Sequence, residues 1–554
     1  MAWANDTVMD YVQRWLEACP DRVWLRDRKG DDFSEWTWQS AFDEFQAVAA
    51  WLEAQYGDSG TSIGILSKNR AHWTLADMAI LASGNVSIPL FTTQNAETTE
   101  YILNFAEVKL IVLGEASNWD KIKPILPADT KVLVLPGVDA GEDVDALHWN
   151  DVAQEFKGQR AKHQCRHDEL FTIPFTSGTT GLPKGVMQTH DSMLIPAVRA
   201  LDFFQIRENP RLFSYLPLSH IAERAIVWIN SLVCCGTITY NEDQNTLVRD
   251  MSETAPTLFF GVPRVWEMLH QGILAKLGSQ ETLDAMLADD KAGTQALIQA
   301  ATGFTDYDIL LSAAAPIPAS LLRWYETLGI TICEGFGQTE AMGLIGNTPD
   351  NRRIGSVGRP VPGVQVKLSE DNELMCKADG LSTGYYKQPE KTAETFVDGW
   401  VHTGDKARID EDGFIYITGR VKDYFKTVQG KFVAPPPIED AFAECHYVEQ
   451  LCLLGRGYSK TVMTCVLSPA AAEKPKETVE KALLDQTEKV NNAIEKHARI
   501  GAVIISEEPW SIDNGMMTPT MKLKRDQVEA KFGERAQELA SQSAQTKAIM
   551  LEWH

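Results

Sequence analysis

Residues 176–185 read TSGTTGLPKG, and they directly follow LFTIPF (170–175), an apolar run that predicts a buried strand. Glycine permits close backbone approach, so successive N–H groups of the decapeptide can converge on an anion, while the hydroxyls and Lys184 add donors. A phosphate loop of the Walker type needs Ser or Thr after its lysine, but Gly185 follows Lys184 here. We therefore predict a phosphate-holding loop of another type, because a simple flexible turn does not account for the full pattern after a strand.

Short apolar runs alternate with amphipathic segments on both sides of this loop. The runs that predict strands are SIGIL (62–66), KLIVL (109–113), KVLVL (131–135), TLFFGV (257–262) and DILLSA (308–313). Residues 97–105 predict a helix between two of these strands. A second helix is predicted by an apolar stripe made of Trp38, Phe42, Phe45, Ala49 and Leu52. Strand, helix and strand at this spacing indicate a parallel sheet in an α/β body.

The charge distribution changes near residue 420. Residues 1–420 hold 35 basic and 57 acidic residues, whereas residues 421–554 hold 17 and 19. We therefore predict two domains, a large body at 1–420 with sheets flanked by helices in several layers and a small α+β domain at 421–554. Residues 473–499 and 523–539 predict helices in the smaller domain.

Composition excludes several functional classes. The 554 residues carry a formal charge of −24, so we expect no nucleic-acid partner and no electrostatic attraction to anionic lipid. Nine cysteines without a CxxC pattern predict reduced, mostly buried thiols. No signal peptide is evident, and the most apolar stretch (225–240) is too short to span a bilayer. We expect a cytoplasmic protein with at most weak peripheral contact with the inner face of a membrane; the sequence does not indicate its oligomeric state.

A second segment, EGFGQTE (334–340), combines residue types that suit a nucleotide. Phe336 offers an aromatic face for stacking, and Gly337 allows close backbone approach. Thr339 supplies a hydroxyl for a phosphate, and Glu340 supplies a hard oxygen ligand of the kind that Mg2+ prefers. Phe336 alone would normally be interpreted as a core aromatic, but the adjacent Gly-Gln-Thr-Glu reverses that interpretation. The segment therefore predicts a nucleotide and magnesium site.

Taken together, these segments resemble the signature of the adenylate-forming (AMP-binding) superfamily, and in particular the bacterial long-chain fatty acyl-CoA synthetases. Further matching segments, in the order of the family, are SYLPLSHIAER (214–224), LFFGVPRVWEML (258–269), SAAAPIP (312–318), GWVHTGD (399–405), GRVKDYFKT (419–427) and TPTMKLKR (518–525). The resemblance spans nearly the whole chain, and LFFGVPRVWEML is the segment most similar to the long-chain branch. It implies that the small C-terminal domain is mobile.

The resemblance also implies roles for individual residues. Those implied to bind the nucleotide or to lie at the domain hinge are Thr176, Ser177, Gly178, Thr179, Thr180, Lys184, Ala313, Ala314, Glu334, Gly335, Phe336, Gly337, Asp405, Arg420 and Lys422. Within this set, Ala313 and Ala314 stand at the adenine where the family often has Gly, Asp405 and Arg420 face the ribose hydroxyls, and Lys422 lies at the hinge. The implied catalytic residues are Lys522, His220, Thr339 and Glu340, and the implied magnesium ligands are Glu340 and Thr176.

Three assignments keep an alternative. A lone histidine is more often structural than catalytic, so His220 is either a hydrogen-bonding residue or part of the acyl and pyrophosphate sites. Trp266 stands either at the mouth of an acyl tunnel or in the core. Lys522 lies three residues before Arg525, the spacing of the family's catalytic lysine, but Lys524 is a rival.

The predicted function is that of an ATP-dependent, magnesium-requiring acyl-CoA synthetase. A medium- or long-chain fatty acid would attack the α-phosphate of ATP to form acyl-AMP, and coenzyme A would then displace AMP. Catalysis of this kind rests on positioning and charge neutralisation. The alternatives are a fatty-acyl-AMP ligase, an aryl-CoA synthetase and a non-enzymatic acyl-nucleotide-binding module.

Overall fold

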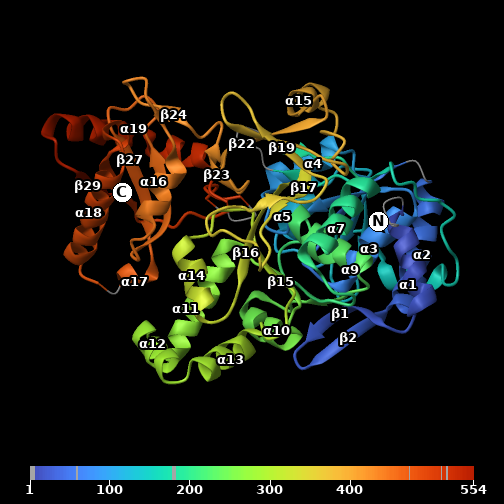
Figure 1. Cartoon of the computed structure of the whole chain (residues 1–554). Coiled ribbons are helices and arrows are strands. Elements are labelled where there is room, and N and C mark those ends of the chain that lie inside the picture. The colour runs from blue at the N-terminus through green and yellow to red at the C-terminus, as the bar shows by residue number, and fades with distance from the viewer. Residues whose placement is uncertain (1–5, 58–59, 177–181, 473, 513, 519–521) are drawn as a thin grey trace.

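The computed structural model describes residues 6–57, 60–176, 182–472, 474–512, 514–518 and 522–554. Figure 1 shows a large body, coloured blue to yellow along the chain, beside a smaller C-terminal part in orange and red. Both parts combine sheets with helices that pack against them, so the predicted fold, an α/β body with a small α+β C-terminal domain, is confirmed. The boundary at residue 420 stays a prediction.

A seven-stranded sheet holds the first part of the body, in the order β11-β8-β4-β3-β5-β6-β7. Its strands are β3 (Ser62–Leu66), β4 (Val86–Leu90), β5 (Leu110–Leu113), β6 (Lys131–Val134), β7 (Ala146–His148), β8 (Leu170–Thr172) and β11 (Gln188–Thr189). All neighbours are parallel except β11 and β8. Every residue of β3, β4 and β5 is buried, as expected where helices cover both faces. β3, β5 and β6 confirm the strands predicted at 62–66, 109–113 and 131–135, whereas β4 was not predicted.

A nine-stranded sheet continues the body, in the order β18-β17-β16-β15-β14-β12-β13-β1-β2. Its strands are β1 (Val23–Lys29), β2 (Asp32–Thr37), β12 (Arg211–Ser214), β13 (Thr237–Tyr240), β14 (Leu258–Phe260), β15 (Ile309–Ser312), β16 (Ile332–Gln338), β17 (Ala341–Gly346) and β18 (Arg359–Pro360). The strands from β16 to β1 in this order are parallel. Their carboxyl ends therefore open at one edge, which is where open α/β sheets bind ligands.

Helices cover both sheets. They are α1 (Val8–Ala18), α2 (Trp38–Tyr56), α3 (Ala71–Ala82), α4 (Ala96–Phe105), α5 (Trp119–Ile122), α6 (Trp149–Glu155), α7 (His190–Phe204), α8 (Ile221–Glu223), the π-helix η2 (Arg224–Ile229), α9 (Asn230–Val233), α10 (Leu247–Thr254), α11 (Pro263–Leu277), α12 (Gln280–Asp289), α13 (Lys291–Thr302), α14 (Ala319–Thr327) and α15 (Pro389–Thr395). The predicted apolar stripe of α2 is buried in the main core. Thr37 caps this helix by accepting a hydrogen bond from the Ser40 N–H.

The strand predicted at 170–175 is divided. β8 ends at Thr172, and β9 (Phe175–Thr176) leaves the sheet to pair with β10 (Lys184–Gly185) as an antiparallel hairpin. Pro174 lies between the two strands and has no N–H to donate to a ladder, which explains the break. The glycine-rich loop thus connects two paired strands, and Ser177, Gly178, Thr179 and Thr180 lie outside the described residues.

A third sheet borders the C-terminal part. It consists of β19 (Gln365–Leu368), β20 (Glu373–Lys377), β21 (Phe396–Val397), β22 (Trp400–Ile409) and β23 (Ile415–Arg420). β22 and β23 are antiparallel, and Asp405 pairs with Arg420 across them. The strand register alone therefore brings together the two residues predicted to hold the ribose.

The C-terminal part is built on a four-stranded sheet, β26-β27-β28-β29, preceded by a hairpin of β24 and β25. Its elements are β24 (Phe425–Lys426), β25 (Phe432–Val433), α16 (Pro435–Phe442), β26 (Val448–Leu454), β27 (Thr461–Leu467), α17 (Pro469–Ala472), α18 (Lys476–Ala493), β28 (Ile500–Ser506), α19 (Arg525–Thr546) and β29 (Met550–Trp553). α18 and α19 confirm the two predicted helices with shifted ends. α18 is shorter because the chain turns extended at Ile494, and α19 is longer because its polar last turns continue to Thr546.

The cysteines agree with the predicted reduced state. All nine are free thiols; Cys19 and Cys165 are half-buried and the others are buried. Within the residues that the structure describes, no helix combines the length and the apolar character needed to cross a membrane.

Candidate functional site

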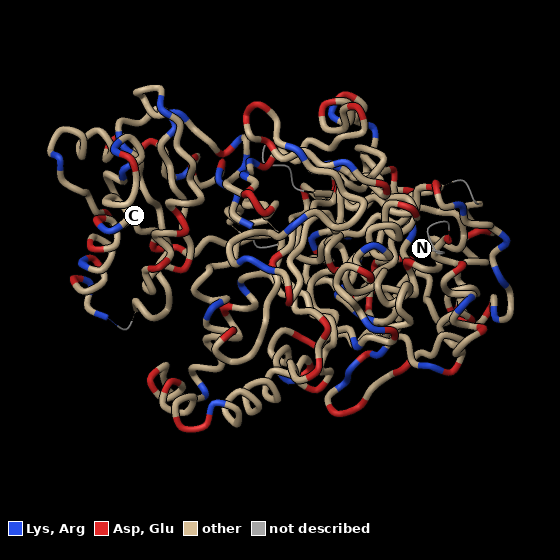
Figure 2. The backbone as a smooth tube through the Cα atoms, viewed as in Figure 1, with Lys and Arg blue, Asp and Glu red and all other residues tan. Residues whose placement is uncertain are grey.

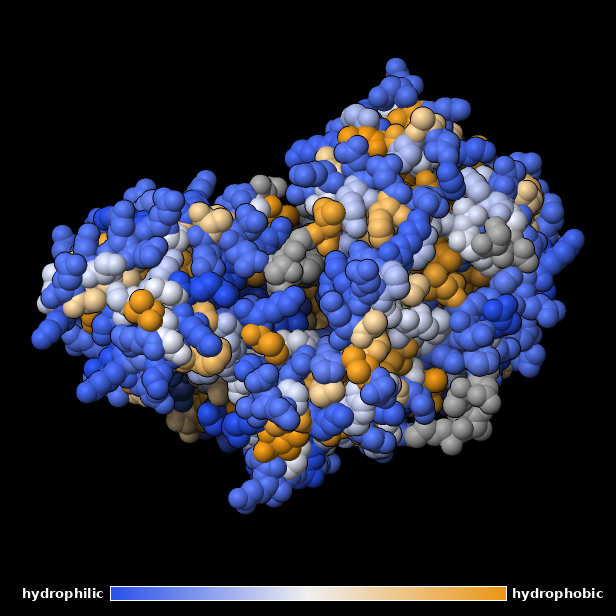
Figure 3. Space-filling model, turned by 90° about the horizontal axis from the view of Figure 1, so that it is seen from above, coloured by the Kyte–Doolittle hydropathy of each residue, from blue (hydrophilic) through white to orange (hydrophobic). Residues whose placement is uncertain are grey.

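A cavity of about 2420 Å3 lies at the carboxyl ends of the parallel strands, where the body meets the C-terminal part. Figure 3 shows the surface hollowed between the two parts. The predicted site residues that line this cavity are Thr176, Lys184, His220, Ala313, Ala314, Glu334, Gly335, Phe336, Gly337, Thr339, Glu340, Asp405, Arg420, Lys422 and Lys522. The structure therefore brings together all the predicted site residues that it describes, and their individual roles stay predictions.

A carboxylate and a guanidinium face each other at one side of the cavity. Arg420 Nε lies 2.9 Å from Asp405 Oδ1, and Gln338 Nε2 donates to Asp405 Oδ2 at 2.7 Å. Burial raises the pKa of Asp405 to about 6, although Arg420 and Gln338 oppose that shift. This pair can accept and donate hydrogen bonds side by side, as recognition of a vicinal diol requires.

A second cluster connects the phosphate-loop lysine to the predicted magnesium ligand. The Tyr385 hydroxyl donates to Glu340 Oε1 at 2.6 Å, and Lys184 Nζ lies 4.7 Å from the centre of the Tyr385 ring. Burial lowers the pKa of Lys184, and the nearby cations Lys391 and Lys422 add to this while Glu340 opposes it. A cation and a carboxylate are thus held around one phenol ring at the cavity wall.

The β16–β17 connection carries the nucleotide segment. Gln188 Nε2 donates to the Thr339 carbonyl at 2.5 Å, which fixes the turn to β11. A Cβ atom at Gly337 would lie 3.1 Å from the Gly343 amide nitrogen, so the close strand approach favours glycine. Burial raises the pKa of Glu334 to about 7, against the hydrogen bond from the Gly355 N–H.

Ala314 adopts a backbone conformation that glycine would adopt more easily. Its φ is +72°, in the left-handed region, whereas Ala313 is not among the described residues with positive φ. The two residues follow β15 directly and line the cavity. The turn after β15 needs a residue in the left-handed conformation at position 314, which glycine adopts most easily. This requirement explains why the family often has glycine at this turn.

His220 and Lys522 approach each other from different parts of the chain. The His220 ring accepts a hydrogen bond at Nδ1 from the Ala222 N–H, 3.2 Å away. Burial, together with the charge of Lys522, lowers the pKa of His220 to about 3, so its imidazole is neutral at physiological pH. His220 therefore has a structural capping contact and also faces the cavity.

Lys522 lies three residues before the start of α19 at Arg525. Its N–H donates to Thr518 Oγ1 at 3.0 Å, and its carbonyl accepts from the Thr518 N–H at 2.8 Å. The Lys522 side chain is accessible to solvent through the cavity, but the protein atoms around it reduce its hydration. Burial and the charge of Arg420 lower the pKa of Lys522, while Asp405 and Glu340 oppose the shift. The ammonium of this C-terminal residue thus lies among the charged groups of the body.

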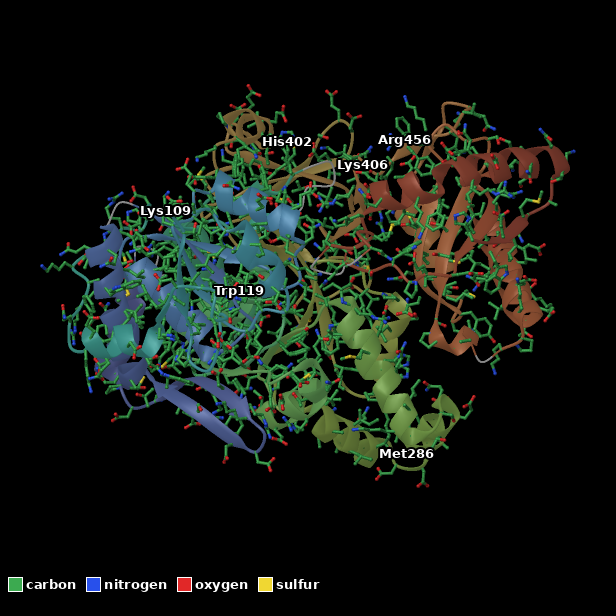
Figure 4. The ribbon with its side chains drawn as sticks, turned by 180° about the vertical axis from the view of Figure 1, so that it is seen from behind. Lys109, Trp119, Met286, His402, Lys406 and Arg456 are labelled. Atoms are coloured by element: carbon green, nitrogen blue, oxygen red, sulfur yellow. The ribbon has the colours of Figure 1, made fainter. Side chains whose placement is uncertain are left out.

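The crossing between the two parts follows Arg420. Lys422 is exposed in the turn after β23, and Lys406 Nζ lies 4.6 Å from the Tyr424 ring centre. Figure 4 shows Lys406 at the border between the body and the C-terminal part. On the other side, Arg525 pairs with Glu439 at 2.8 Å and approaches Asp423 at 3.7 Å. A short segment with contacts to both parts therefore connects them.

The part of the cavity where α7 packs against η2 is apolar, and we call it the apolar end. Its lining includes Met193, Pro196, Ala197, Ala200 and Phe204 of α7, Ala225 and Ile226 of η2, and Leu258, Phe260 and Leu311 of β14 and β15. Trp266 lies in the core, fully buried against Phe259 and Tyr325, and does not line the cavity. The core interpretation of Trp266 is therefore the one that the structure supports.

Three polar residues of the site were missed from the sequence. Tyr385, Gln338 and Gln188 hold Glu340, Asp405 and the nucleotide segment by the hydrogen bonds given above. Gln338 was part of the quoted EGFGQTE segment, but nothing local indicated its distant partner. Gln188 and Tyr385 stand in stretches without any pattern that points to a ligand.

Two family models match separate parts of the chain. The family described as AMP-binding enzyme matches residues 12–386, and the AMP-binding enzyme C-terminal domain matches residues 422–543. A long-chain-fatty-acid–CoA ligase, FadD15, from Mycobacterium bovis is 29% identical, over 95% of this chain and 96% of its own. The peroxisomal long chain acyl-CoA synthetase 7 of Arabidopsis thaliana is 27% identical, over 98% and 87%.

Solved structures show the same fold. The adenylation domain of a carboxylate reductase from Mycobacterium chelonae has a TM-score of 0.80 at 22% identity, covering 97% of this chain and 91% of that one. The anthranilate CoA ligase AuaEII, in complex with anthranoyl-AMP, has a TM-score of 0.79 at 21% identity, with 96% and 98% covered. At these identities the likeness concerns the architecture alone.

Proposed function

Because this chain belongs to the AMP-binding enzyme family, we propose that it is an ATP-dependent fatty acyl-CoA synthetase. It activates a medium- or long-chain fatty acid as acyl-AMP and transfers the acyl group to coenzyme A. One observation carries the proposal: the cavity that gathers Lys184, Glu340, Asp405, Arg420 and Lys522 continues into an apolar end. The long-chain fatty acid–CoA ligases among its relatives support the same substrate class.

The nucleotide is proposed to lie across the ends of the parallel strands. Asp405 accepts hydrogen bonds from the ribose hydroxyls, and Arg420 keeps this carboxylate in place. Lys184 faces the phosphates, while Ala314 allows the adenine to approach the chain after β15. Figure 2 shows basic residues at the junction of the two parts, where the triphosphate would meet an otherwise very acidic protein.

The residues at the phosphate side fit a magnesium ion. Glu340 presents a carboxylate oxygen to the cavity, and the Thr176 hydroxyl lies in the neighbouring hairpin, 3.4 Å from the Lys184 carbonyl. Hard oxygen donors of this kind are what Mg2+ prefers, so Glu340 and Thr176 would hold it. When bound, the ion supplies neutralisation of phosphate charge. Tyr385 orients Glu340 for this task through its 2.6 Å hydrogen bond.

Adenylation is proposed to use position and charge rather than a covalent enzyme intermediate. The acid enters with its chain between α7 and η2 and its carboxylate at the polar end. Lys522 then reaches both the carboxylate and the α-phosphate, where negative charge crowds as the oxygen attacks phosphorus. Pyrophosphate leaves with the electron pair of the broken P–O bond. His220, held neutral, adds no charge and lines the passage between the acyl and phosphate ends.

Thioester formation needs a different arrangement of the C-terminal domain. We propose that this domain rotates about the segment at Lys422, which removes Lys522 from the site and opens a path for the thiol. The thiolate attacks the acyl carbon, and AMP leaves. The turn after β23 supports this hinge, since Lys422 lies in that turn and its side chain is exposed.

The deciding experiment measures pyrophosphate release and thioester formation with saturated acids from acetate to stearate, plus benzoate and cinnamate. We expect both activities, with a preference for chains of about twelve carbons or more, because each buried methylene adds about 0.8 kcal/mol. Pyrophosphate release without coenzyme A-dependent AMP release would indicate an acyl-AMP ligase. A maximum with benzoate would indicate an aryl-CoA synthetase, and ATP binding without turnover would indicate a non-enzymatic module.

We also propose a cytoplasmic location, with weak peripheral contact with a membrane at most. The support is chemical: nine free thiols suit a reducing compartment, and a charge of −24 gives no general attraction to anionic lipid. Fractionation of cells at low and high salt, followed by activity measurement in each fraction, tests this.

A further inference from the structure

Outside the cavity, side chains able to bind a metal gather in the segment that precedes β8. His163, Cys165 and Glu169 each offer a ligand atom, and these three atoms lie within 4.8 Å of one another. His163 Nε2 lies 2.9 Å from Glu169 Oε1. None of the three lines the cavity described above, so the proposed reaction does not account for them.

The surroundings hold His163 in place. The Glu53 carboxylate of α2 accepts hydrogen bonds from the backbone N–H groups of Lys162 and His163, at 2.9–3.1 Å. The His163 ring lies against Gly84, where a Cβ atom would come within 2.7 Å of Nδ1. The segment that carries these ligands is thus tied to α2 and fitted to the turn after α3.

A fourth side chain, His190, is fully buried and aimed at the cluster. Its Nε2 lies 3.7 Å from Glu169 Oε1 and makes no hydrogen bond within the described structure. Its Nδ1 accepts the Val8 N–H at 3.2 Å, so the ring proton is on Nε2 and points towards the carboxylate. Outer donors of this kind commonly orient carboxylates that bind metals.

We propose that His163, Cys165 and Glu169 form a binding site for Zn2+, with His190 as the residue that positions Glu169. One nitrogen, one sulfur and one oxygen donor suit this borderline-soft ion, and a water molecule would complete four-coordination. Binding forms the Zn–S bond and releases the thiol proton of Cys165 to solvent.

A metal here would hold residues 163–169 together before β8 and, through the contact between Glu169 and His190, connect them to the start of α7. Because β8 leads directly to β9 and the phosphate loop, zinc would stabilise the body without taking part in chemistry. The simpler alternative is that His163 and Glu169 form a structural hydrogen bond and bind no ion.

The test uses the full-length protein, stripped with chelator and then titrated with ZnCl2 or CoCl2. We expect one equivalent of zinc to survive gel filtration and to raise Tm, and the cobalt form to show a thiolate-to-metal charge-transfer absorption. Cys165→Ser and Glu169→Gln each remove a ligand, so each should weaken zinc binding by more than the roughly 10- to 100-fold that loss of an outer-shell partner costs. Cys19→Ser is the matched control, because Cys19 is the other half-buried cysteine, and it should bind zinc normally.

A second measurement, the alkylation of individual cysteines, needs no variant and so does not depend on whether a variant folds. In the unmodified protein, zinc should protect Cys165 from alkylation and leave the reactivity of Cys19 unchanged. No retained zinc, a cobalt spectrum without the thiolate band, or equal zinc binding by the Cys165→Ser variant would overturn the proposal.

Discussion

Arg420 Nε lies 2.9 Å from Asp405 Oδ1 because β22 and β23 pair these two residues directly. The contact therefore depends on strand register rather than on a flexible loop. Asp405 depends on this contact more than Arg420 does, because the carboxylate is almost fully buried whereas the guanidinium is half-exposed. Burial raises the pKa of Asp405 to about 6 despite this contact, which gives the site a measurable pH dependence.

The first prediction concerns that dependence. An ionised Asp405 accepts the ribose hydroxyls, so the KM for ATP should rise as the pH falls through about 6. Asp405→Asn should give a high KM that no longer changes in this range. Initial rates of pyrophosphate release between pH 5 and 8 measure both, and parallel pH profiles for the two proteins would contradict the assignment.

The same shift has a consequence for stability. The folded protein binds the Asp405 proton more tightly than the unfolded chain does, whose carboxyl titrates near pH ~3.9. Asp405 therefore lowers the free energy of unfolding as the pH rises from about 4 to about 6. In Asp405→Asn this decrease of the free energy of unfolding with pH should be absent.

Tyr385 provides a second prediction. Tyr385→Phe removes the hydroxyl that donates to Glu340 but keeps the ring beneath Lys184. A hydrogen bond to a charged group contributes about 1.5–3 kcal/mol, so adenylation should fall roughly tenfold or more, and excess Mg2+ should partly restore it. Glu340→Gln should lose more activity at every Mg2+ concentration. If both variants release pyrophosphate normally at limiting Mg2+, neither residue supports the metal.

Ala314 gives a prediction about stability rather than rate. A left-handed conformation costs an L-residue about 1–2 kcal/mol. Replacing alanine by glycine removes this cost, but it destabilises the fold by about 0.4–1 kcal/mol because glycine gives the unfolded chain more conformational entropy. Ala314→Gly should therefore leave the free energy of unfolding unchanged or slightly raised. Ala313→Gly, next to it but without positive φ, should lower it by about 0.5–1 kcal/mol. Chemical denaturation compares the two, and equal destabilisation would show that the turn is not strained.

The sequence predicted what local patterns encode. SIGIL could be recognised as a continuous apolar run, because a strand in a parallel sheet is buried on both faces. The stripe of α2 could be recognised because burial of a helix face repeats with the helical period. Lys184, Glu340, Asp405 and Arg420 stood in short segments whose residue types suit phosphate, metal and ribose. The structure then placed them around one cavity, although the patterns alone gave no distances.

What could not be predicted depends on contacts between distant segments. Tyr385 reaches Lys184 and Glu340 only through the tertiary fold, and alanine at position 314 gives no sign of a positive φ. Trp266 had two equally good interpretations because an indole suits a core and a tunnel alike. Burial against Phe259 and Tyr325 decided between them.

A fourth prediction tests the apolar end of the cavity. Ala225 lies on η2, and Ala225→Phe would fill space between that helix and α7. Hexadecanoate should lose most of its kcat/KM, while butanoate should be nearly unaffected and serves as the control within the same variant. Equal losses for both acids, measured by pyrophosphate release, would mean that the chain runs elsewhere.

The last prediction concerns Lys522, whose ammonium lies close enough to Arg420, Asp405 and Glu340 for their charges to alter its pKa. This is the arrangement that adenylation needs, because the cation faces the place where the carboxylate meets the α-phosphate. Losing a preorganised charge of this kind costs about 100- to 1000-fold in rate. Lys522→Ala should therefore be nearly inactive with ATP and free acid, yet still form thioester from supplied acyl-AMP and coenzyme A.

Lys524→Ala is the matched control, since Lys524 has the same charge, lines the same cavity and lies two residues away. Its backbone N–H is bonded to the Met516 carbonyl, and we expect its removal to spare both half-reactions. A selective adenylation defect in Lys524→Ala instead of Lys522→Ala would shift the catalytic lysine by two residues. Equal loss of both half-reactions in Lys522→Ala would argue against two positions of the C-terminal domain, because a lysine carried away from the site after adenylation cannot be needed in the second step.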